Sequence, residues 1–360
     1  MSVSHAVCKE LLRSNAFGAV PTTVSKRALL PADDGGPLVH PLDDSFASMD
    51  PPEHTRLRKI VAPSFTPAAM RAQTSFVERV VQEELDRLDG HGKVDLIDEF
   101  AVRVPSRVIC ELLGMPTSDH ELFVKWGIEF GVIVDGARTP GELRRTRVLL
   151  TEMSRYFTAL CEQRSHEPQD DLITKMVQSA AAGEMTQAGL IATCEALLIG
   201  GFVTTANIIG NGVVALLAQP DQRDMFLQNL DLAATLVEEV LRLDAPAQYS
   251  VRITREPVEL AGAELKKGTP IVALLAGANR DPAVFTAPDQ LDLARPNPRD
   301  HLSFAAGIHY CIGAGLARLE GEIALRALFE RFPGLKIAGR AQYCPSRVIR
   351  GPMHLPVRTS

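Results

Sequence analysis

The sequence predicts a mostly helical protein with a small β region, and three observations lead to this fold class. From residue 52 to residue 243, apolar side chains recur at helical spacing in segments that end at proline or glycine. Residues 186–219 contain no proline and are apolar on nearly every side, which is typical of a helix inside a core. Residues 251–277 hold short apolar runs separated by glycine turns, which is typical of strands.

The elements follow one another with clear breaks. A short amphipathic piece at residues 5–13 precedes a Pro-, Gly- and Asp-rich stretch to about residue 50, which we expect to be a functional loop. Helices are expected over residues 52–62, 67–88, 96–113, 118–134, 141–164, 170–182, 186–219, 232–243 and, after a polar connector at 279–300, 313–332. Strands are expected over residues 251–258, 259–265 and 270–277. Without repeats or a low-complexity linker, residues 1–360 are expected to form a single domain.

The composition excludes several classes of protein. The formal net charge is -6 and no block of Lys or Arg stands out, which argues against a nucleic-acid binder. The six cysteines form no C-x-x-C pair, so a structural zinc site is not expected. The first residues lack the apolar centre of a signal peptide, which favours a cytoplasmic protein. Residues 196–218 are uncharged, but their hydroxyls, amides and glycines favour a buried helix over a membrane span.

One cysteine has a distinctive setting. Cys311 lies between Gly307 and Gly313, just before the last predicted helix. The N-terminus of that helix would stabilise a thiolate, so Cys311 is suited to be a soft axial ligand to iron. Phe304 would then pack against the flat side of a cofactor, and His309 would donate to a carboxylate. The other cysteines are interpreted as buried and inert.

The segment from Phe304 to Gly313 resembles the haem-binding loop of the cytochrome P450 family, whose pattern is F-x-x-G-x-H-x-C-x-G. The resemblance implies a haem b bound through Cys311, with Phe304, His309 and Gly313 in the same loop. It extends over nearly the whole chain and implies the cytochrome P450 fold.

Two further motifs of that family occur in the family's order. Glu239 and Arg242 match E-x-x-R, and the resemblance implies that Arg295 completes a buried structural charge network with them. His54 and Arg58 share one helical face, and the resemblance assigns them, with Arg252 and His309, to the haem propionates.

The long apolar helix carries a third motif, Gly200-Gly201-Phe202-Val203-Thr204. In the family, small residues here leave room for dioxygen and substrate, and the threonine hydroxyl directs the proton that promotes O–O cleavage. The resemblance therefore assigns these roles to Gly201 and Thr204. Without it, a mid-helix threonine is more simply interpreted as bonding back to a carbonyl four residues earlier.

The sequence departs from the family pattern in three places. Val203 stands where the family has an acid, and Glu195 lies on the opposite side of the helix from Thr204. Proton delivery is then left to water, Asn207 or a substrate hydroxyl, which predicts weak coupling. Ala305 replaces a glycine, so the backbone there is expected to avoid the left-handed region.

The third departure is the short N-terminus, which lacks the family's usual first helix and first strands. The strand at residues 271–275 is then expected to lack a neighbour unless another element covers it.

The resemblance implies a haem-dependent monooxygenase that inserts one atom of O2 into a lipophilic small molecule. A ferredoxin and an NAD(P)H-dependent ferredoxin reductase would supply electrons, docking near Cys311 with Arg56, Lys59 and Arg318 as candidate contacts. The pocket is expected to involve residues 17–47, 129–149 and 247–251, with Leu197, Gly201 and Thr204. Two alternatives stay open: a peroxide-driven haem enzyme, and a non-catalytic haem-binding sensor or carrier. Substrate, regiochemistry and oligomeric state are not readable from the sequence.

Overall fold

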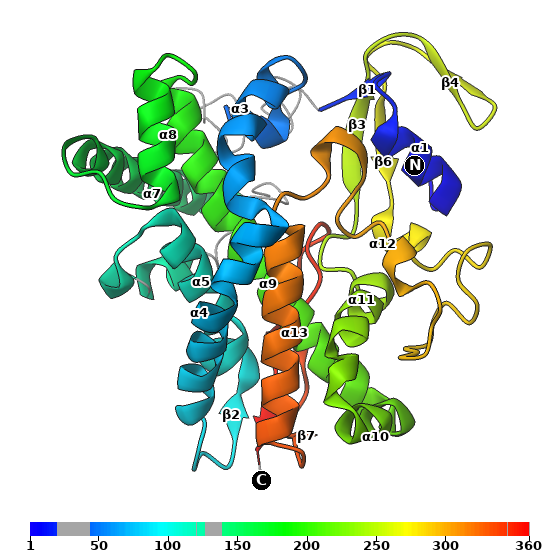
Figure 1. Ribbon diagram of the computed structural model, residues 1–360. Helices are drawn as coiled ribbons and strands as arrows, with labels where there is room; N and C mark the ends of the chain where they lie inside the picture. Colours follow the sequence, from blue (N-terminus) through cyan, green and yellow to red (C-terminus); the bar gives the residue numbers. More distant parts are fainter. Residues whose placement is uncertain (20–43, 120, 127–138, 344, 360) are drawn as a thin grey trace.

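The computed structural model describes residues 1–19, 44–119, 121–126, 139–343 and 345–359 (Figure 1). The α-helices are α1 (His5–Arg13), α3 (Glu53–Val61), α4 (Pro67–Asp86), α5 (Arg103–Leu113), α7 (Pro140–His166), α8 (Leu172–Ala181), α9 (Gln187–Ala218), α10 (Pro220–Gln228), α11 (Ala233–Leu243), α12 (Leu275–Ala278) and α13 (Ala314–Arg331). Short helical turns, among them η1 (Phe46–Ser48), η3 (Ile97–Ala101) and η7 (Gly307–His309), connect several of them.

The strands are short and form four small sheets. They are β1 (Phe17–Gly18), β2 (Val94–Asp95), β3 (Ser250–Thr254), β4 (Val258–Leu260), β5 (Ala263–Leu265), β6 (Pro270–Ala273), β7 (Lys336–Ile337), β8 (Gln342–Tyr343), β9 (Pro352–His354) and β10 (Pro356–Arg358). The sheet orders are β1-β3-β6, β2-β10-β7, β4-β5 and β8-β9. The mostly helical fold class with a small β region is therefore confirmed. The single domain stays a prediction.

Helix α9 crosses the centre of the molecule (Figure 1). Its side chains belong to two apolar clusters. One cluster joins it to α4, α5, α11 and α13, and the other joins it to α5, α7 and α8. The Thr186 side chain caps its start, and Pro220 follows its end. By length and composition α9 is apolar enough to cross a membrane, but 67% of its most apolar window is buried in the protein, as expected for a core helix.

Three strand predictions are wrong in detail. The strand expected over 251–258 ends at Thr254 in β3, and the next strand, β4, begins only at Val258. Residues 259–265 do not form one strand, because Ala261 and Gly262 both adopt positive φ and turn the chain between β4 and β5. The strand expected over 270–277 ends at Ala273, after which the chain forms α12.

Two helix predictions also differ from the structure. The helix expected over 96–113 begins with the π-helical turn η3 before α5. Of the helix expected over 118–134, residues 121–126 are helical and residues 127–134 lie outside the described part.

The N-terminal residues cover the sheet edge that the sequence leaves in question. The Ser2 amide donates to the carbonyl of Val272 at 3.0 Å, and the Leu274 amide donates to the carbonyl of Ser2 at 3.0 Å. On its other side β6 pairs with β3, so this strand has neighbours on both edges.

Candidate functional site

A cavity of about 400 Å³ lies beneath α9 and above the loop that precedes α13. Cys311, Phe304 and His309 of the loop line it, as do Arg58 and Thr204. Its remaining wall is mostly apolar, with Ile109, Leu197, Ile199, Pro246, Leu275 and Leu316 among its residues. Of the segments expected at the pocket, residues 46–47, 247 and 249–250 line it. The expectation is wrong for residues 17–19 and 144–149, which do not line it; Leu149 packs in the apolar cluster of α5, α7 and α8 instead. Residues 20–43 and 127–138 lie outside the described part.

The loop that carries Cys311 is held by its own backbone. The Cys311 amide donates to the carbonyl of Phe304 at 3.0 Å, and Gly307 turns the chain with φ +72°. A Cβ on Gly307 would meet the carbonyl of Leu12, so the turn needs glycine. Ala305 has φ +58°, which contradicts the expectation that it avoids the left-handed region. The bond from its amide to the carbonyl of Leu302, at 2.8 Å, fixes it in this strained conformation.

The Cys311 side chain opens into the cavity with protein packed around it. Burial raises the pKa of its thiol, and the Gly313 amide, Arg58 and Arg318 act in the opposite direction. The expected stabilisation of a thiolate by the α13 N-terminus is therefore present but smaller than the effect of burial. A metal that binds this sulfur must displace the thiol proton.

Four basic side chains gather beside the loop, and we call His54, Arg58, Arg252 and His309 the basic cluster. The rings of His54 and His309 are 4.5 Å apart, and Arg58 donates to the carbonyl of Tyr310 at 2.7 Å. Burial, then Arg252 and His54, lower the pKa of His309 to about 4. Burial and Arg58 lower the pKa of His54.

The basic cluster lacks enough negative charge of its own. Both ring nitrogens of His54, and Nε2 of His309, are buried without a hydrogen-bond partner among the described residues. Asp50 approaches His309 only to 3.9 Å. Buried polar atoms are normally satisfied, so this arrangement fits a ligand with carboxylate groups. Together with the cysteine sulfur, these residues fit a haem and its propionates.

Helix α9 presents small and uncharged residues to the cavity. A Cβ on Gly200 would meet nothing within 4 Å, whereas one on Gly201 would lie 2.7 Å from Ile109 of α5. The space over the loop thus comes from Gly200, the first glycine of the motif, and Gly201 permits the close packing of α5 instead. The hydroxyl of Thr204 lines the cavity and donates to the carbonyl of Gly200 at 3.0 Å.

The α9 residues considered above for proton delivery, and the valine that replaces the family's acid, do not line the cavity. Val203 packs against the apolar cluster of α5, α7 and α8. Glu195 is buried, which raises its pKa to about 8, and it is not among the lining residues. Asn207 lies against Gly351 and is also absent from the lining.

Glu239, Arg242 and Arg295 form a fully buried network. Arg242 donates to both carboxylate oxygens of Glu239, at 2.7 and 3.0 Å, and Arg295 donates to one at 2.8 Å. Arg242 also reaches the carbonyl of Asn279, whose side chain bonds Leu302 and Ser303 at the start of the loop. The network therefore supports the loop from below.

Sequence reasoning missed a second acid network beside this one. Glu238 accepts from His301 and Arg318, and Arg318 lies over the ring of Phe304. A sequence signal exists in the pair Glu238-Glu239, but spacing alone did not show which arginine each carboxylate would meet. Arg318, expected as a docking contact, is thus held by an ion pair, and Arg56 bonds the carbonyl of Glu184. Lys59 is exposed.

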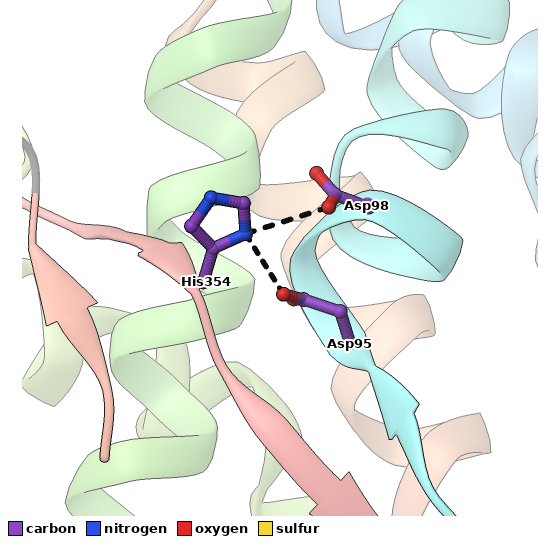
Figure 2. Close-up of side chains that lie close together, drawn as sticks. All are labelled: Asp95, Asp98 and His354. Atoms are coloured by element: carbon purple, nitrogen blue, oxygen red, sulfur yellow. Dashed lines mark hydrogen bonds and ion pairs between the residues drawn. The ribbon is translucent and has the colours of Figure 1, made fainter. Parts of the chain in front are cut away.

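A further cluster of Asp95, Asp98 and His354 lies away from the cavity, where the end of β2 and the turn η3 meet the end of β9 (Figure 2). His354 Nδ1 is 2.9 Å from Asp95 and 3.5 Å from Asp98. Asp95 also accepts from the amides of Ile97 and Leu355. The cluster thus ties two chain segments together and takes no part in the cavity.

The comparisons with known proteins agree on one family. The family model described as Cytochrome P450 matches residues 144–339. The chain is 37% identical to the "Putative cytochrome P450 140" of Mycobacterium tuberculosis, over 99% of this chain and 84% of that protein. It is 37% identical to the "6-deoxyerythronolide B hydroxylase" of Saccharopolyspora erythraea, over 87% and 78%. The structure of P450BioI in complex with hexadec-9Z-enoic acid ligated acyl carrier protein is similar with a TM-score of 0.90 and 31% identity, covering 99% of this chain and 91% of that one.

Proposed function

The chain belongs to the cytochrome P450 family and is a haem monooxygenase, and from this premise we propose that it hydroxylates or epoxidises a lipophilic small molecule with electrons from a ferredoxin. The observation that carries the proposal is the joint placement of Cys311 and the basic cluster. The sulfur of Cys311 faces the cavity, and beside it lie two arginines and the unpartnered imidazole nitrogens of His54 and His309.

Different residues would hold different parts of the cofactor. Cys311 would supply the sulfur ligand to iron, and His54, Arg58, Arg252 and His309 would bind the propionates. Phe304 and Gly313 would contact the haem from the loop, and Gly201 allows α5 to pack close to α9. When bound, a haem with a thiolate ligand supplies the activation of dioxygen.

Thr204 would direct the proton on the side of the cavity that α9 forms. Because its hydroxyl hydrogen is directed to the Gly200 carbonyl, its oxygen is left to accept a hydrogen bond from water or substrate. Val203, Glu195 and Asn207 do not line the cavity, and among the described residues no acidic side chain does, which supports proton delivery by water or by a substrate hydroxyl. A path without a fixed acid predicts weak coupling between electron use and product formation.

The lining supports a lipophilic substrate of moderate size, because apolar side chains form most of the wall. Electrons come from a partner, since the chain has no dinucleotide fingerprint after a strand. We infer a ferredoxin with its NAD(P)H-dependent reductase, and a cytoplasmic location.

Reconstitution with a ferredoxin, its reductase, NAD(P)H and 18O2 tests this function on a panel of lipophilic compounds. We expect an oxygenated product that carries one labelled atom, preceded by a substrate-induced spin-state change. Product with hydrogen peroxide alone, and none with the ferredoxin system, would instead support the peroxide-driven enzyme that Val203 makes credible. A protein that binds haem but shows neither product nor spin-state change is a sensor or carrier.

A further inference from the structure

The second acid network, around Glu238 of α11, is connected to the cysteine loop through Arg318. Glu238 is 2% exposed, and its carboxylate accepts from Arg318 at 2.7 and 3.2 Å and from His301 at 2.9 Å. Burial alone would raise the pKa of Glu238, but the bonds from His301 and Arg318 lower it to about 2. Nδ1 of His301 accepts from the Ser303 amide. Arg299, which is largely exposed, also approaches Glu238 to 3.4 Å, but Arg318 is the arginine that donates two hydrogen bonds to this carboxylate.

The other side of Arg318 contacts the loop at two points. Its guanidinium carbon lies 4.6 Å from the centroid of the Phe304 ring, and its Nη1 bonds the Tyr310 hydroxyl at 3.0 Å. Phe304 accepts the Cys311 amide through its carbonyl, and Tyr310 directly precedes Cys311. Arg318 thus touches both aromatic residues that flank the sulfur ligand, and its charge lies close to that sulfur.

We propose that the Glu238–Arg318 ion pair is a positioning pair that fixes Phe304 and Tyr310 around Cys311 and, through its balanced charge, sets the reduction potential of the iron bound there. The proposal rests on the proposed function, because it concerns the haem-loaded protein. It differs from the role of the Glu239 network, since Arg242 and Arg295 contact the connector and not the aromatic residues of the loop.

Removing one charge of the Glu238–Arg318 pair at a time should shift the reduction potential in opposite directions. Glu238→Gln leaves the positive charge of Arg318 unbalanced beside the loop, which favours the reduced iron and raises the potential. Arg318→Gln leaves the negative charge of Glu238 and lowers the potential. The double variant removes both charges and returns the potential toward that of the wild type.

A redox titration of the haem-loaded wild type, both single variants and the double variant tests the proposal. Arg318→Lys, which keeps the charge and loses the paired geometry, should stay near the wild-type potential with a smaller thiolate-ligated fraction. Arg164→Gln is the control, because Arg164 and Asp171 form a buried ion pair, at 2.6 Å, between α7 and α8, which is more buried than Arg318 and lies outside the cysteine loop. We expect that variant to lose stability without a shift in potential.

Shifts of the same sign in both single variants, or a double variant displaced further than either, would overturn the proposal. So would a shift in Arg164→Gln as large as those at the pair. If Glu238→Gln does not fold, the comparison of Arg318→Lys with Arg318→Gln decides, since the proposal requires only the second to shift. A wild type without a thiolate-ligated haem would refute the proposed function itself, whereas normal ligation with unshifted potentials would refute this inference alone.

Discussion

The basic cluster and the stretch of α9 from Gly200 to Thr204 face the same site with opposite chemistry. The basic cluster concentrates buried cationic and imidazole groups and leaves several nitrogens unpaired. The α9 stretch offers two glycines, a valine that points into the apolar core and a threonine bonded to its own helix. Folding of the basic cluster without its ligand is unfavourable because it buries unpaired nitrogens. The residues of the α9 stretch are packed or hydrogen-bonded without a ligand. The groups that hold the cofactor are thus retained, and the family's fixed proton donor is not.

The largest effect on stability is expected from a change in the Glu239–Arg242–Arg295 network, which supports the site from below. Glu239→Gln leaves Arg242 and Arg295 buried with an incomplete counter-charge, and breaking such a network typically costs about 3–5 kcal/mol. We expect little folded, haem-loaded protein on expression, measured by absorbance and by chemical unfolding. Glu83→Gln is the control, because its ion pair with Arg107 is half-exposed and should matter little. Equal stability of the two variants would contradict the supporting role of the network.

The basic cluster should also make the haem-free protein sensitive to acid. The pKa of His309 is lowered from 6.5 to about 4 in the folded state, so folding favours its neutral form. As the pH falls from 6.5 toward 4, the unfolded chain gains a proton that the folded chain does not, and stability decreases. We expect His309→Gln to flatten this part of the stability profile, measured by urea unfolding at a series of pH values. An unchanged profile would show that His309 is not held neutral.

His54→Phe should separate folding from cofactor binding. Removing two unpartnered buried nitrogens should raise the stability of the haem-free protein by about 1 kcal/mol. The same change should weaken haem retention roughly tenfold, which corresponds to about 1.4 kcal/mol. Haem transfer to apomyoglobin gives the retention. His5→Phe is the control, because His5 is equally buried but bonded to the Asp300 carbonyl, and it should lose stability.

The α9 stretch is tested by restoring an acid. Val203→Asp places the acid in an apolar cluster and not in the cavity lining, so it should lower stability and leave product per NAD(P)H near the wild-type value. Val203→Asn, which has nearly the shape of the aspartate without its acid group, is the control. Clearly higher coupling in Val203→Asp than in Val203→Asn would contradict this placement and would show that an acid at this position reaches the site.

The smallest effect is expected at Ala305. Ala305→Gly removes the strain of a Cβ at positive φ and should raise the free energy of unfolding by no more than about 1 kcal/mol. Ala306→Gly is the control, because Ala306 has φ −154° and a glycine there only adds chain entropy. A loss of stability in both variants would mean that Ala305 is unstrained.

The sequence predicted those parts of the molecule that repeat a periodic or motif pattern. The bounds of α9 and α13 lie close to expectation because core burial leaves few alternatives. The Glu239–Arg242–Arg295 network agrees with what the family resemblance implied, since the spacing of Glu239 and Arg242 alone did not point to Arg295. The sequence did not predict the turn at Ala261, the strain at Ala305 or the contact of Gly201 with α5. Each depends on a neighbour far along the chain or on backbone geometry that residue type alone does not determine. Glu238 was missed because two adjacent glutamates point to different partners.

The account centres on a haem bound through the thiolate of Cys311 and anchored by the basic cluster. The most direct test is the carbon monoxide difference spectrum of the reduced, purified protein. The account predicts a strongly red-shifted Soret band that Cys311→Ser abolishes. A band at the unshifted position of a neutral-thiol or histidine ligand in the wild type, or a red-shifted band that survives in Cys311→Ser, would contradict it.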